Sequence, residues 1–559
     1  MSSNIDKKNG FYPYELTLQS IEPTPTAMDT SNPIDLLYDN NNQDISAKNN
    51  PRREEFEMDE IQVQEIANSS IIKLDWALIK SHKKVILLCI LISFTGWNFG
   101  YDTGIIGGIV QMKPFLYHFG EKEVDHYTMK SWIKGLIISI YHIGCIIGGL
   151  TIARSAEYIG RKPPIFIALS TYIIAMIIEI TSKISSSWIQ FTIGRFINGL
   201  AIGSLGCLGP MFLSETSPTE IRGSITSFYQ INIVSGILFG SITVYLTNAR
   251  FPNNDLCWII PLCCCVGIAI LGLLGLIIVP ESSRYLISKG KYKDAKLSLI
   301  KLNDSNPDKT LELMISKLKF DNSIMNNSNI GFYQMLKSKI YLKRLLIGIT
   351  LMWLQQMTGI DYFFYYGVQL FESAGINNSY ITSIILGIVN WGSAFPGIYI
   401  IERFGRKITL LVGSILCSIN LFIYSIVGST KFKLDATDSS ENRDSGIIMI
   451  LFTCLFIISY GITWGPAGSV VVAELYPIQI KAKAMALSQS FNWGANFFIA
   501  FCTPIITEKI HYKYGFVFSG CCFISFWFVL IMVPETKGIS LEEIEELFHD
   551  DYDDEKKQP

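Results

Sequence analysis

Twelve apolar segments, each about 20 residues or longer, follow one another along this chain of 559 residues. A helix of that length crosses the roughly 30 Å of hydrocarbon in a bilayer. Only 17% of the residues are charged, against about a quarter in soluble proteins, and the deficit falls in these segments. We therefore predict an all-α membrane protein with twelve transmembrane helices, at roughly 85–110, 131–153, 163–183, 188–210, 224–247, 256–279, 344–370, 380–402, 407–429, 446–471, 482–506 and 514–533.

Three short motifs occur twice, in the same order and at nearly the same spacing. EYIGRK at 157–162 returns as ERFGRK at 402–407, SETSPTEIR at 214–222 as AELYPIQIK at 473–481, and PESSR at 280 as PETKG at 534. The offsets of 245, 259 and 254 residues indicate a duplicated six-helix unit. Two such halves around a solute site are the architecture of a carrier that works by alternating access.

The polar segments complete the expected organisation. We expect a disordered N-terminal tail at 1–83, a first six-helix half at 84–279, a helical insert at 280–343, a second half at 344–533 and a short C-terminal tail at 534–559. Lys and Arg concentrate in the even-numbered connections between the segments. By the positive-inside rule, both termini and the insert are cytosolic. The expected location is the plasma membrane.

Five longer motifs, taken jointly, are specific. They are GYDTG at 100–104, GRFINGLAIG at 194–203, VPESSRYL at 279–286, WLQQMTGIDYFFYYG at 353–367 and VPETKGISLEEIEELF at 533–548. Together they resemble the sugar porter family of the major facilitator superfamily, and within it the fungal hexose transporters. The resemblance runs from about Trp97 to Leu547, and it implies the major facilitator fold.

A sugar needs several hydroxyls bound at once, and neutral amides suit this because they both donate and accept hydrogen bonds. A lone amide in a membrane helix more often joins two helices. The resemblance instead assigns these mid-helix side chains to the sugar, with Phe99, Tyr365 and Tyr366 as aromatic walls. The candidates are Gln230, Gln355, Gln356, Asn390, Asn492 and Trp493.

Two positions depart from the family pattern inside the inferred cavity. Asp361 stands where the family generally has Asn, and Ser469 where it usually has a bulky aromatic. Both are counted as substrate-binding candidates, and they leave the identity of the sugar open. Asp361 has three interpretations: a neutral carboxyl that mimics an amide, an ionised group that selects a cationic or donor-rich solute, or a drifted position in a chain that senses rather than transports.

Charged residues at the predicted cytosolic ends of the helices recur in both halves. Charges at that depth are tolerated only when they are paired. The resemblance implies that the glutamates meet the arginines while the carrier is open outward, and that the network breaks as the halves rock. The predicted gate residues are Glu157, Arg161, Glu215, Arg222, Glu402, Arg406, Glu474 and Lys481.

Asp102 and Arg195 form a further ionisable pair at membrane depth. In proton-coupled members of the family the equivalent Asp is the protonation site and the Arg its modulator. Members without coupling also carry this Asp. Proton symport and facilitated diffusion therefore both stay open.

The sequence thus predicts a secondary transporter of a hexose or related polyol, acting as a monomer in the lipid bilayer. No nucleotide-binding loop of the GxxxxGK type occurs, and we expect no enzymatic activity, cofactor, metal site or nucleic-acid partner. Two alternatives stay open. One is a nutrient sensor of similar fold, although such sensors have long C-terminal tails and here 26 residues follow the last segment. The other is a carrier of inositol, another polyol or a disaccharide.

Overall fold

The structure is a computed structural model, and it describes residues 83–123, 126–217, 222–302, 306–327, 332–373, 379–430, 440–477, 480–537 and 548. The chain divides into two compact units, Met1–Lys73 and Leu74–Pro559, and the described residues all belong to the second. The predicted tails, 1–83 and 534–559, fall almost wholly outside the described residues.

Twelve membrane-spanning helices can be traced in the described part of the chain. Ten continuous helical stretches are long and apolar enough to cross a membrane, and one of them, Lys481–Met532, contains two helices joined at its middle. The twelfth is a broken helix made of two shorter pieces. The prediction of an all-α membrane protein is confirmed.

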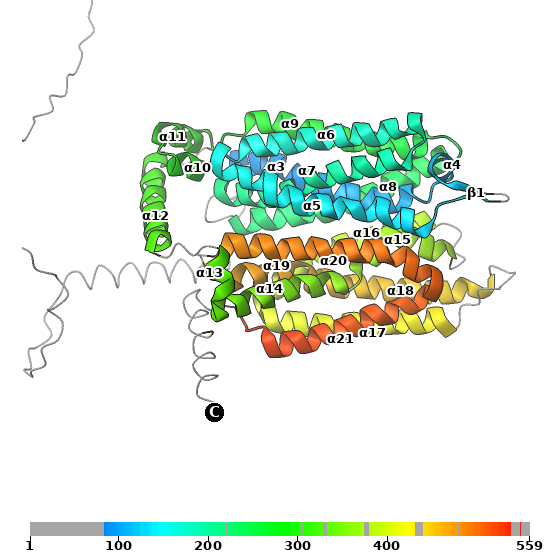
Figure 1. The fold of residues 1–559 in the computed structure, drawn as a ribbon. Helices are drawn as coiled ribbons and strands as arrows, with labels where there is room; N and C mark the ends of the chain where they lie inside the picture. Colours follow the sequence, from blue (N-terminus) through cyan, green and yellow to red (C-terminus); the bar gives the residue numbers. More distant parts are fainter. Residues whose placement is uncertain are drawn as a thin grey trace, which may run out of the picture. The chain divides into compact units, whose positions relative to one another are not determined.

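The first half contains six long helices in chain order (Figure 1). They are α3 (Lys83–Ile109), α5 (Ser131–Ile159), α6 (Lys162–Ser185), α7 (Trp188–Thr216), α8 (Arg222–Arg250) and α9 (Leu256–Ile278). Helix α5 packs on α7, α3 on α8, and α6 on both α7 and α9. Between α3 and α5 lie the short helix α4 (Lys113–Phe119) and the antiparallel strands β1 (Glu121–Glu123) and β2 (His126–Thr128).

The second half repeats this plan with two broken helices. Its elements are α14 (Lys339–Met357), α15 (Ile360–Ser373), α16 (Ser379–Phe404), α17 (Arg406–Thr430), α18 (Ser440–Ile462), α19 (Trp464–Leu475), α20 (Lys481–Ile510), the 3₁₀ turn η1 (His511–Lys513) and α21 (Tyr514–Met532). Helices α14 and α15 form one span, and α18 and α19 form another. The halves meet where α5 packs on α20, α8 on α16 and α3 on α15.

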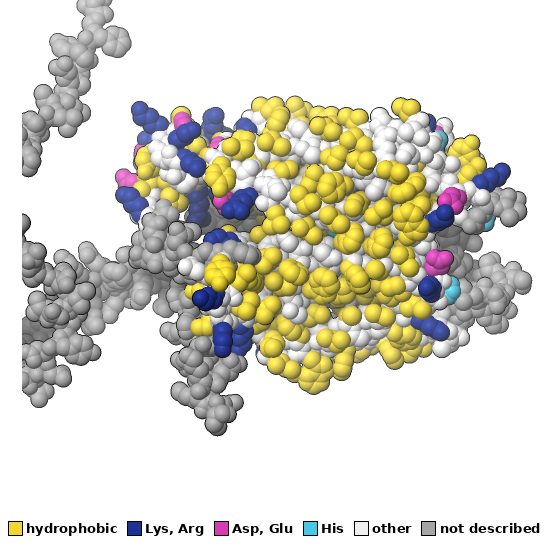
Figure 2. Space-filling view, in the orientation of Figure 1, with side chains coloured by type: hydrophobic (Ala, Val, Ile, Leu, Met, Phe, Trp, Pro, Cys, Tyr) yellow, Lys and Arg dark blue, Asp and Glu magenta, His cyan; other side chains and the backbone are white. Residues whose placement is uncertain are grey.

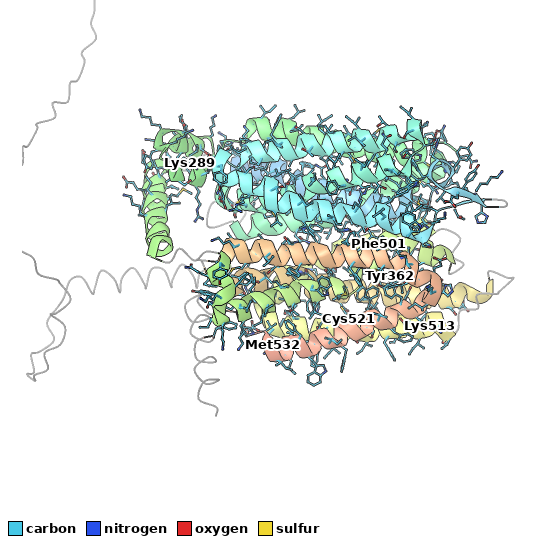
Figure 3. All side chains as sticks on the ribbon, in the orientation of Figure 1. Lys289, Tyr362, Phe501, Lys513, Cys521 and Met532 are labelled. Carbon is cyan, nitrogen blue, oxygen red and sulfur yellow. The ribbon has the colours of Figure 1, made fainter. Side chains whose placement is uncertain are left out.

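The insert between the halves is helical and lies at one end of the bundle (Figure 1). It consists of α10 (Ser283–Ser288), α11 (Tyr292–Lys301), α12 (Pro307–Asn327) and α13 (Phe332–Lys337). We call this end the insert end, and the end with α4 and β1 the far end. Figure 3 shows Lys289 at the insert end, Lys513 at the far end, and Tyr362 between the helices of the second half.

The surface of the bundle matches a lipid environment. Figure 2 shows hydrophobic side chains across its middle, with Lys and Arg gathered toward the two ends, most of them at the insert end. Many large apolar side chains are exposed on the spanning helices, among them Ile177, Leu274, Phe422 and Ile531. A soluble protein rarely exposes so much apolar surface. Hydrocarbon, not water, is the solvent that these side chains fit.

Candidate functional site

The break between α14 and α15 places polar side chains inside the second half. Gly359 has φ +88°, a conformation that side-chain-bearing residues rarely adopt, and a Cβ there would lie 2.5 Å from the ring of Phe518. The helix therefore stops at Met357 and restarts at Ile360. Non-helical backbone at membrane depth is tolerated where it is buried in protein or lines a cavity.

A network of side-chain amides joins three helices beside this break. Gln356 Nε2 donates to Asn492 Oδ1 at 3.0 Å. Asn492 Nδ2 donates to Gln355 Oε1 at 3.0 Å and to the carbonyl of Met352 at 2.9 Å. Gln355 Nε2 donates to the carbonyl of Trp464 at 2.9 Å, in the break between α18 and α19. The structure thus brings together three of the predicted amides, from α14 and α20.

Three buried acceptors around this network have no hydrogen-bond partner among the described residues. They are Oε1 of Gln356, Oδ2 of Asp361 and Oδ1 of Asn496. A buried polar atom without a partner costs about 1–3 kcal/mol. Such acceptors are what the hydroxyl donors of a polyol would satisfy, so the cluster is suited to a polyhydroxylated solute. We call these three side chains with Gln355 and Asn492 the amide cluster.

Aromatic rings connect the amide cluster to the first half. The Trp493 indole on α20 lies 5.5 Å from the ring of Phe99 and 5.9 Å from that of His142, centroid to centroid. His142 Nε2 lies 3.1 Å from the hydroxyl of Tyr365 on α15. The hydroxyl of Tyr366 donates to the Ala500 carbonyl at 2.6 Å. Of the three predicted aromatic walls, Phe99 and Tyr365 lie at the contact between the halves. The hydroxyl of Tyr366 is instead hydrogen-bonded to the backbone of α20.

The other predicted substrate residues lie outside the hydrogen-bond network of the amide cluster, as far as the described residues show. Gln230 is exposed on α8, five residues before Ser235, whose hydroxyl accepts from Trp391 of the second half at 2.9 Å. Asn390 is buried and faces Gly461 on α18, a helix–helix contact. Ser469 is exposed on α19, and its hydroxyl donates to the carbonyl of Pro466 at 3.1 Å.

In the first half, Asp102 and Arg195 form a bidentate ion pair. Arg195 Nη1 lies 2.8 and 2.9 Å from the two Asp102 oxygens, and Asn198 Nδ2 donates to the same carboxylate at 2.9 Å. The guanidinium also lies 4.8 Å from the centroid of the Tyr141 ring. Both charged side chains are buried. The structure therefore pairs the two residues singled out in the sequence and links α3 to α7.

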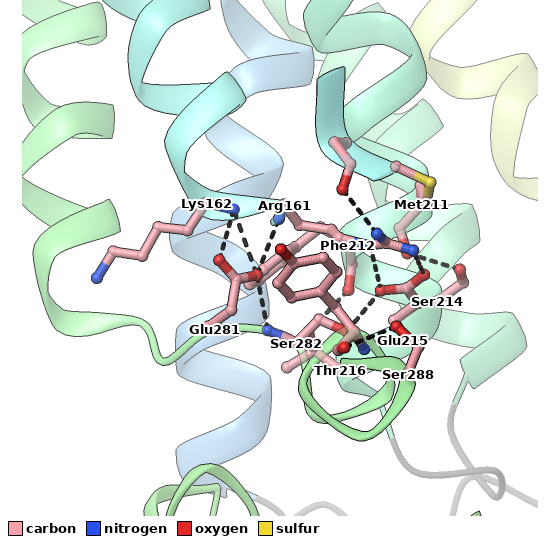
Figure 4. Close-up of polar contacts among 12 residues, drawn as sticks. Arg161, Lys162, Met211, Phe212, Ser214, Glu215, Thr216, Glu281, Ser282 and Ser288 are labelled. Atoms are coloured by element: carbon pink, nitrogen blue, oxygen red, sulfur yellow. Dashed lines mark hydrogen bonds and ion pairs between the residues drawn. The ribbon is translucent and has the colours of Figure 1, made fainter. Parts of the chain in front are cut away.

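Two of the four predicted gate residues of the first half, Arg161 and Glu215, meet next to the insert (Figure 4). Arg161 binds Glu215 through Nε at 2.9 Å and Nη2 at 2.8 Å, and the Ser282 hydroxyl donates to Glu215 at 2.5 Å. Glu281 accepts from the backbone N–H groups of Arg161 at 3.0 Å and Lys162 at 3.2 Å. Four segments of the first half are joined by this network.

The second half builds the same network from the repeated motifs. Arg406 binds Glu474 through Nη2 at 2.8 Å and Nε at 3.2 Å, and the Thr536 hydroxyl donates to Glu474 at 2.5 Å. Glu535 accepts from the backbone N–H groups of Arg406 at 2.9 Å and Lys407 at 3.0 Å. The motifs that are repeated in the sequence therefore form the same set of hydrogen bonds in both halves.

A glycine precedes each of these arginines for a steric reason. Gly160 and Gly405 have φ of +102° and +89°, and a Cβ on them would lie 2.6 Å from Glu281 and 2.7 Å from Glu535. The GRK triplet therefore lets a carboxylate approach the helix start. Burial alone would raise the pKa of Glu535, but hydrogen bonds from four backbone N–H groups outweigh it and hold that pKa below its ordinary value.

As far as the structure describes them, the remaining predicted gate residues make fewer or longer contacts with these two ion-pair networks. Glu157 is exposed, and exposed Glu402 lies 3.7 Å from Arg406. Lys481 is half-buried within electrostatic reach of Glu474. Arg222 begins α8, and its side chain lies outside the described atoms. Both strong ion pairs join helices of the same half, so a movement between the halves does not separate their partners directly. Their role as a gate stays a prediction.

Several polar residues at the core of the structure were not anticipated from the sequence. Asn496 lies one helical turn after Asn492, and this spacing could have indicated it. His142 and Glu179 are ionisable residues inside predicted spans, and such residues are functional candidates by default. Asn98, buried on α3 with both amide atoms unpartnered among the described residues, carried no sequence signal that separates it from other amides.

The whole span of the bundle matches one protein family. The profile of the family described as sugar (and other) transporter covers residues 88–548. Hexose transporter HXT10 of Saccharomyces cerevisiae is 38% identical over 499 residues, which span 88% of this chain and 90% of the relative. The galactose transporter of the same yeast is 39% identical over 473 residues, 83% of this chain and 81% of the relative.

Solved structures show the same fold. The inward-open conformation of the xylose transporter XylE from E. coli superposes with a TM-score of 0.69 at 24% identity, covering 83% of this chain and 99% of that one. XylE bound to 6-bromo-6-deoxy-D-glucose gives a TM-score of 0.66 at 24% identity, covering 84% and 100%. At this identity the likeness concerns the fold alone, which is that of the major facilitator superfamily.

Proposed function

This chain belongs to the sugar transporter family, and we propose that its substrate is a hexose, bound by the amide cluster and carried by alternating access. As a member of this family it is a membrane transporter of sugars and not an enzyme. Its relatives at 38–39% identity are named as hexose and galactose transporters, which supports a hexose among the sugars.

One observation supports this proposal: at an amide network beside a helix break, three buried oxygen acceptors have no hydrogen-bond donor among the described residues. A hexose brings several hydroxyl donors on one small ring, and the Trp493 indole offers an apolar surface beside them. Binding energy from such a site grows with the number of acceptors satisfied at once. The amides that already bond to one another hold the free oxygens in place.

The orientation follows from charge. Lys and Arg concentrate at the insert end of the visible face (Figure 2), so we propose that this end faces the cytosol, in the plasma membrane, with both termini on that side. The networks of Arg161 with Glu215 and of Arg406 with Glu474 then lie at the cytosolic face. We propose that they rigidify the cytosolic end of each half, so that each half moves as one body and the two ends together form the cytosolic gate. We also propose that the carrier works as a monomer.

A second candidate substrate class is a polyol. Ser469 is exposed on α19 where sugar porters usually carry a bulky aromatic, and its small hydroxyl leaves room and a further polar group. A linear or cyclic polyol offers hydroxyls without an anomeric carbon and would fit this change.

The test is uptake of labelled solutes by cells that lack their own hexose transporters. The panel contains glucose, galactose, xylose, inositol, a linear polyol and a disaccharide, each with and without an uncoupler. Saturable hexose uptake supports the proposal, and preferred polyol uptake supports the second candidate. Uptake that an uncoupler abolishes identifies proton symport. A chain that reaches the membrane and takes up none of these solutes contradicts carriage and favours sensing.

A further inference from the structure

Helix α6 places one carboxyl group inside the first half, away from the amide cluster. Glu179 is fully buried, and its side chain runs across the backbone of α7 at Gly194. A Cβ on Gly194 would lie 2.5 Å from Cγ of Glu179. The glycine thus makes room for this carboxyl beside Arg195, the next residue on α7.

Both sides of this contact have unused hydrogen-bonding atoms. Asn198, whose amide donates to Asp102, also lies next to the Glu179 carboxyl. Neither oxygen of Glu179 has a hydrogen bond of good geometry in the described part of the chain, and Nε of Arg195 is also buried without one. The Asp102 carboxylate meets the guanidinium through Nη1 alone. Glu179 and Asp102 both act electrostatically on Arg195. The guanidinium therefore interacts electrostatically with two carboxyl groups and hydrogen-bonds to one of them.

The charges of this cluster do not balance when every group is ionised. Two carboxylates and one guanidinium would leave one negative charge inside the membrane, where an uncompensated charge is costly. The other titratable side chains that face the cluster are Tyr141, His142 and Cys145 from α5, Tyr172 from α6, Cys265 from α9 and Tyr365 from α15. His142 contacts the Ser139 carbonyl and the Tyr365 hydroxyl through its two ring nitrogens, a pattern that a neutral imidazole satisfies, so none of these side chains adds a charge. A single proton on one carboxyl makes the cluster neutral. The bidentate pair assigns the ionised state to Asp102 and the proton to Glu179.

We propose that Glu179 is an alternative ion-pair partner of Arg195, which it takes over when Asp102 releases the guanidinium. In the arrangement seen here, Asp102 is ionised and Glu179 holds the proton. In the second arrangement Glu179 is ionised and bound to Arg195, and Asp102 holds the proton. The cluster carries one proton and no net charge in both. The link between α3 and α7 can then open and close during the transport cycle without leaving a buried cation unpaired.

Infrared spectroscopy of the purified carrier distinguishes this exchange from a merely structural glutamate. The C=O stretch of a protonated carboxylic acid is separate from that of a carboxylate. Glu179→Gln should remove one such band at neutral pH. Asp102→Asn should remove the same band, because Glu179 becomes the sole partner of Arg195 and ionises. The proposal is overturned if Glu179→Gln removes no such band, or if the band that Glu179→Gln removes is still present in Asp102→Asn. Bands of other protonated carboxyls, such as Asp361, should be unchanged in both variants.

Thermal unfolding provides an independent measurement that needs no knowledge of the sugar and no transport. Asp102→Asn and Glu179→Gln should each lower the unfolding midpoint by a few degrees, and the double variant by clearly more than the sum. Replacing Arg195 with Met in the double variant should restore most of that loss, since no buried cation then lacks a partner. An Asp102→Asn variant that fails to fold, or losses that add, contradicts the proposal.

Discussion

The side chain of Gln356 donates a hydrogen bond to Asn492 at 3.0 Å, while its own carbonyl oxygen is buried and has no donor among the residues that the structure describes. The bond fixes the amide of α14 against α20. The free oxygen therefore has a defined position and a missing partner. A side chain that served only to join helices would be expected to satisfy both of its polar atoms.

We expect Gln356→Ala to reduce hexose uptake at least about tenfold, which corresponds to about 1.4 kcal/mol. The change removes an acceptor for a sugar hydroxyl and leaves Oδ1 of Asn492 with only the distant donor of Gln489, at 3.4 Å. Uptake kinetics should show the loss mainly as a higher KM, with surface abundance near that of the wild type.

Gln190→Ala is the matched control, because the Gln190 amide bonds only to α6, at the far end of the first half. Its uptake should equal that of the wild type. If Gln356→Ala keeps wild-type kinetics, Gln356 does not contact the solute and the site must be sought elsewhere.

Much of this arrangement could be predicted from the sequence, because membrane helices restrict the alternatives. Twelve apolar segments and three motifs that each occur twice were enough for the fold. The cost of lone charges at the membrane edge indicated that Arg161 and Glu215 need partners, and the family resemblance implied that they meet each other. Gln355, Gln356 and Asn492 were identified because their residue types and motif positions agree. Their hydrogen bonds to one another confirm that they lie together.

The parts that could not be predicted depend on which way a side chain points. Gln230 and Asn390 carry the same chemical groups as the amide cluster, yet Asn390 faces a glycine of α18 and Gln230 has no hydrogen bond to the cluster among the described residues. The sequence shows where along a helix a residue lies. Which neighbouring helix its side chain contacts depends on how the helices pack, and the sequence pattern does not show this. The same holds for Glu179, whose place depends on Gly194 in another helix.

The ion pair between Arg406 and Glu474 should show coupling in a double-mutant cycle. Removing one partner leaves the other as a partly buried charge without its ion pair, which is costly. Removing both partners removes that cost. Arg406→Ala and Glu474→Ala should each lower transport and thermal stability, and the double variant should lose less than the sum, with a coupling energy of about 1 kcal/mol or more.

An exposed pair provides the comparison. Lys130 and Glu121 lie 2.7 Å apart at the far end, with 56% and 63% of their side chains exposed, so their coupling should stay below about 0.5 kcal/mol. Additive losses at Arg406 and Glu474 would mean that the two side chains do not act as a unit, and the gate role of this pair would be abandoned.

The ionised carboxylate of Glu535 should contribute to the free energy of unfolding, and this contribution should disappear at acidic pH. Its pKa is held below the ordinary value because four backbone N–H bonds outweigh the effect of burial. A carboxyl whose folded-state pKa is lowered stabilises the fold above its unfolded pKa of about 4.3 and loses this contribution as the pH falls through the folded value. Thermal midpoints measured from about pH 7 to about pH 3 should fall more steeply for the wild type than for Glu535→Gln.

At neutral pH the same variant should be less stable than the wild type, because the amide accepts weaker hydrogen bonds from the start of α17. Glu508→Gln, at an exposed carboxyl near the end of α20, should leave the profile unchanged. Parallel profiles for the wild type and Glu535→Gln would show that these backbone hydrogen bonds contribute no measurable stability.

Asp361 is the position where this chain departs most sharply from its family at the amide cluster. Its Oδ2 is buried without a hydrogen-bond partner in the described part of the chain, and Asp361 is the second residue of α15, directly after the helix break. Of the interpretations that the sequence left open, the neutral carboxyl agrees best with these surroundings, because an ionised carboxylate in this place would have the amide of Asn496 as a donor but no countercharge among the described residues.

We therefore expect Asp361→Asn to transport hexose about as well as the wild type at neutral pH and to differ from it only in alkaline medium. There the wild-type carboxyl ionises, which places an unpaired charge at the cavity wall and lowers uptake, whereas asparagine has no proton to lose and keeps its amide contacts with the sugar. The measurement is initial uptake rate against external pH for both proteins, with surface abundance determined in the same cells. A variant that reaches the membrane normally but takes up no hexose at any pH would show that the carboxylate itself binds the solute. That result would favour the ionised interpretation, in which this carrier selects a cationic or donor-rich substrate.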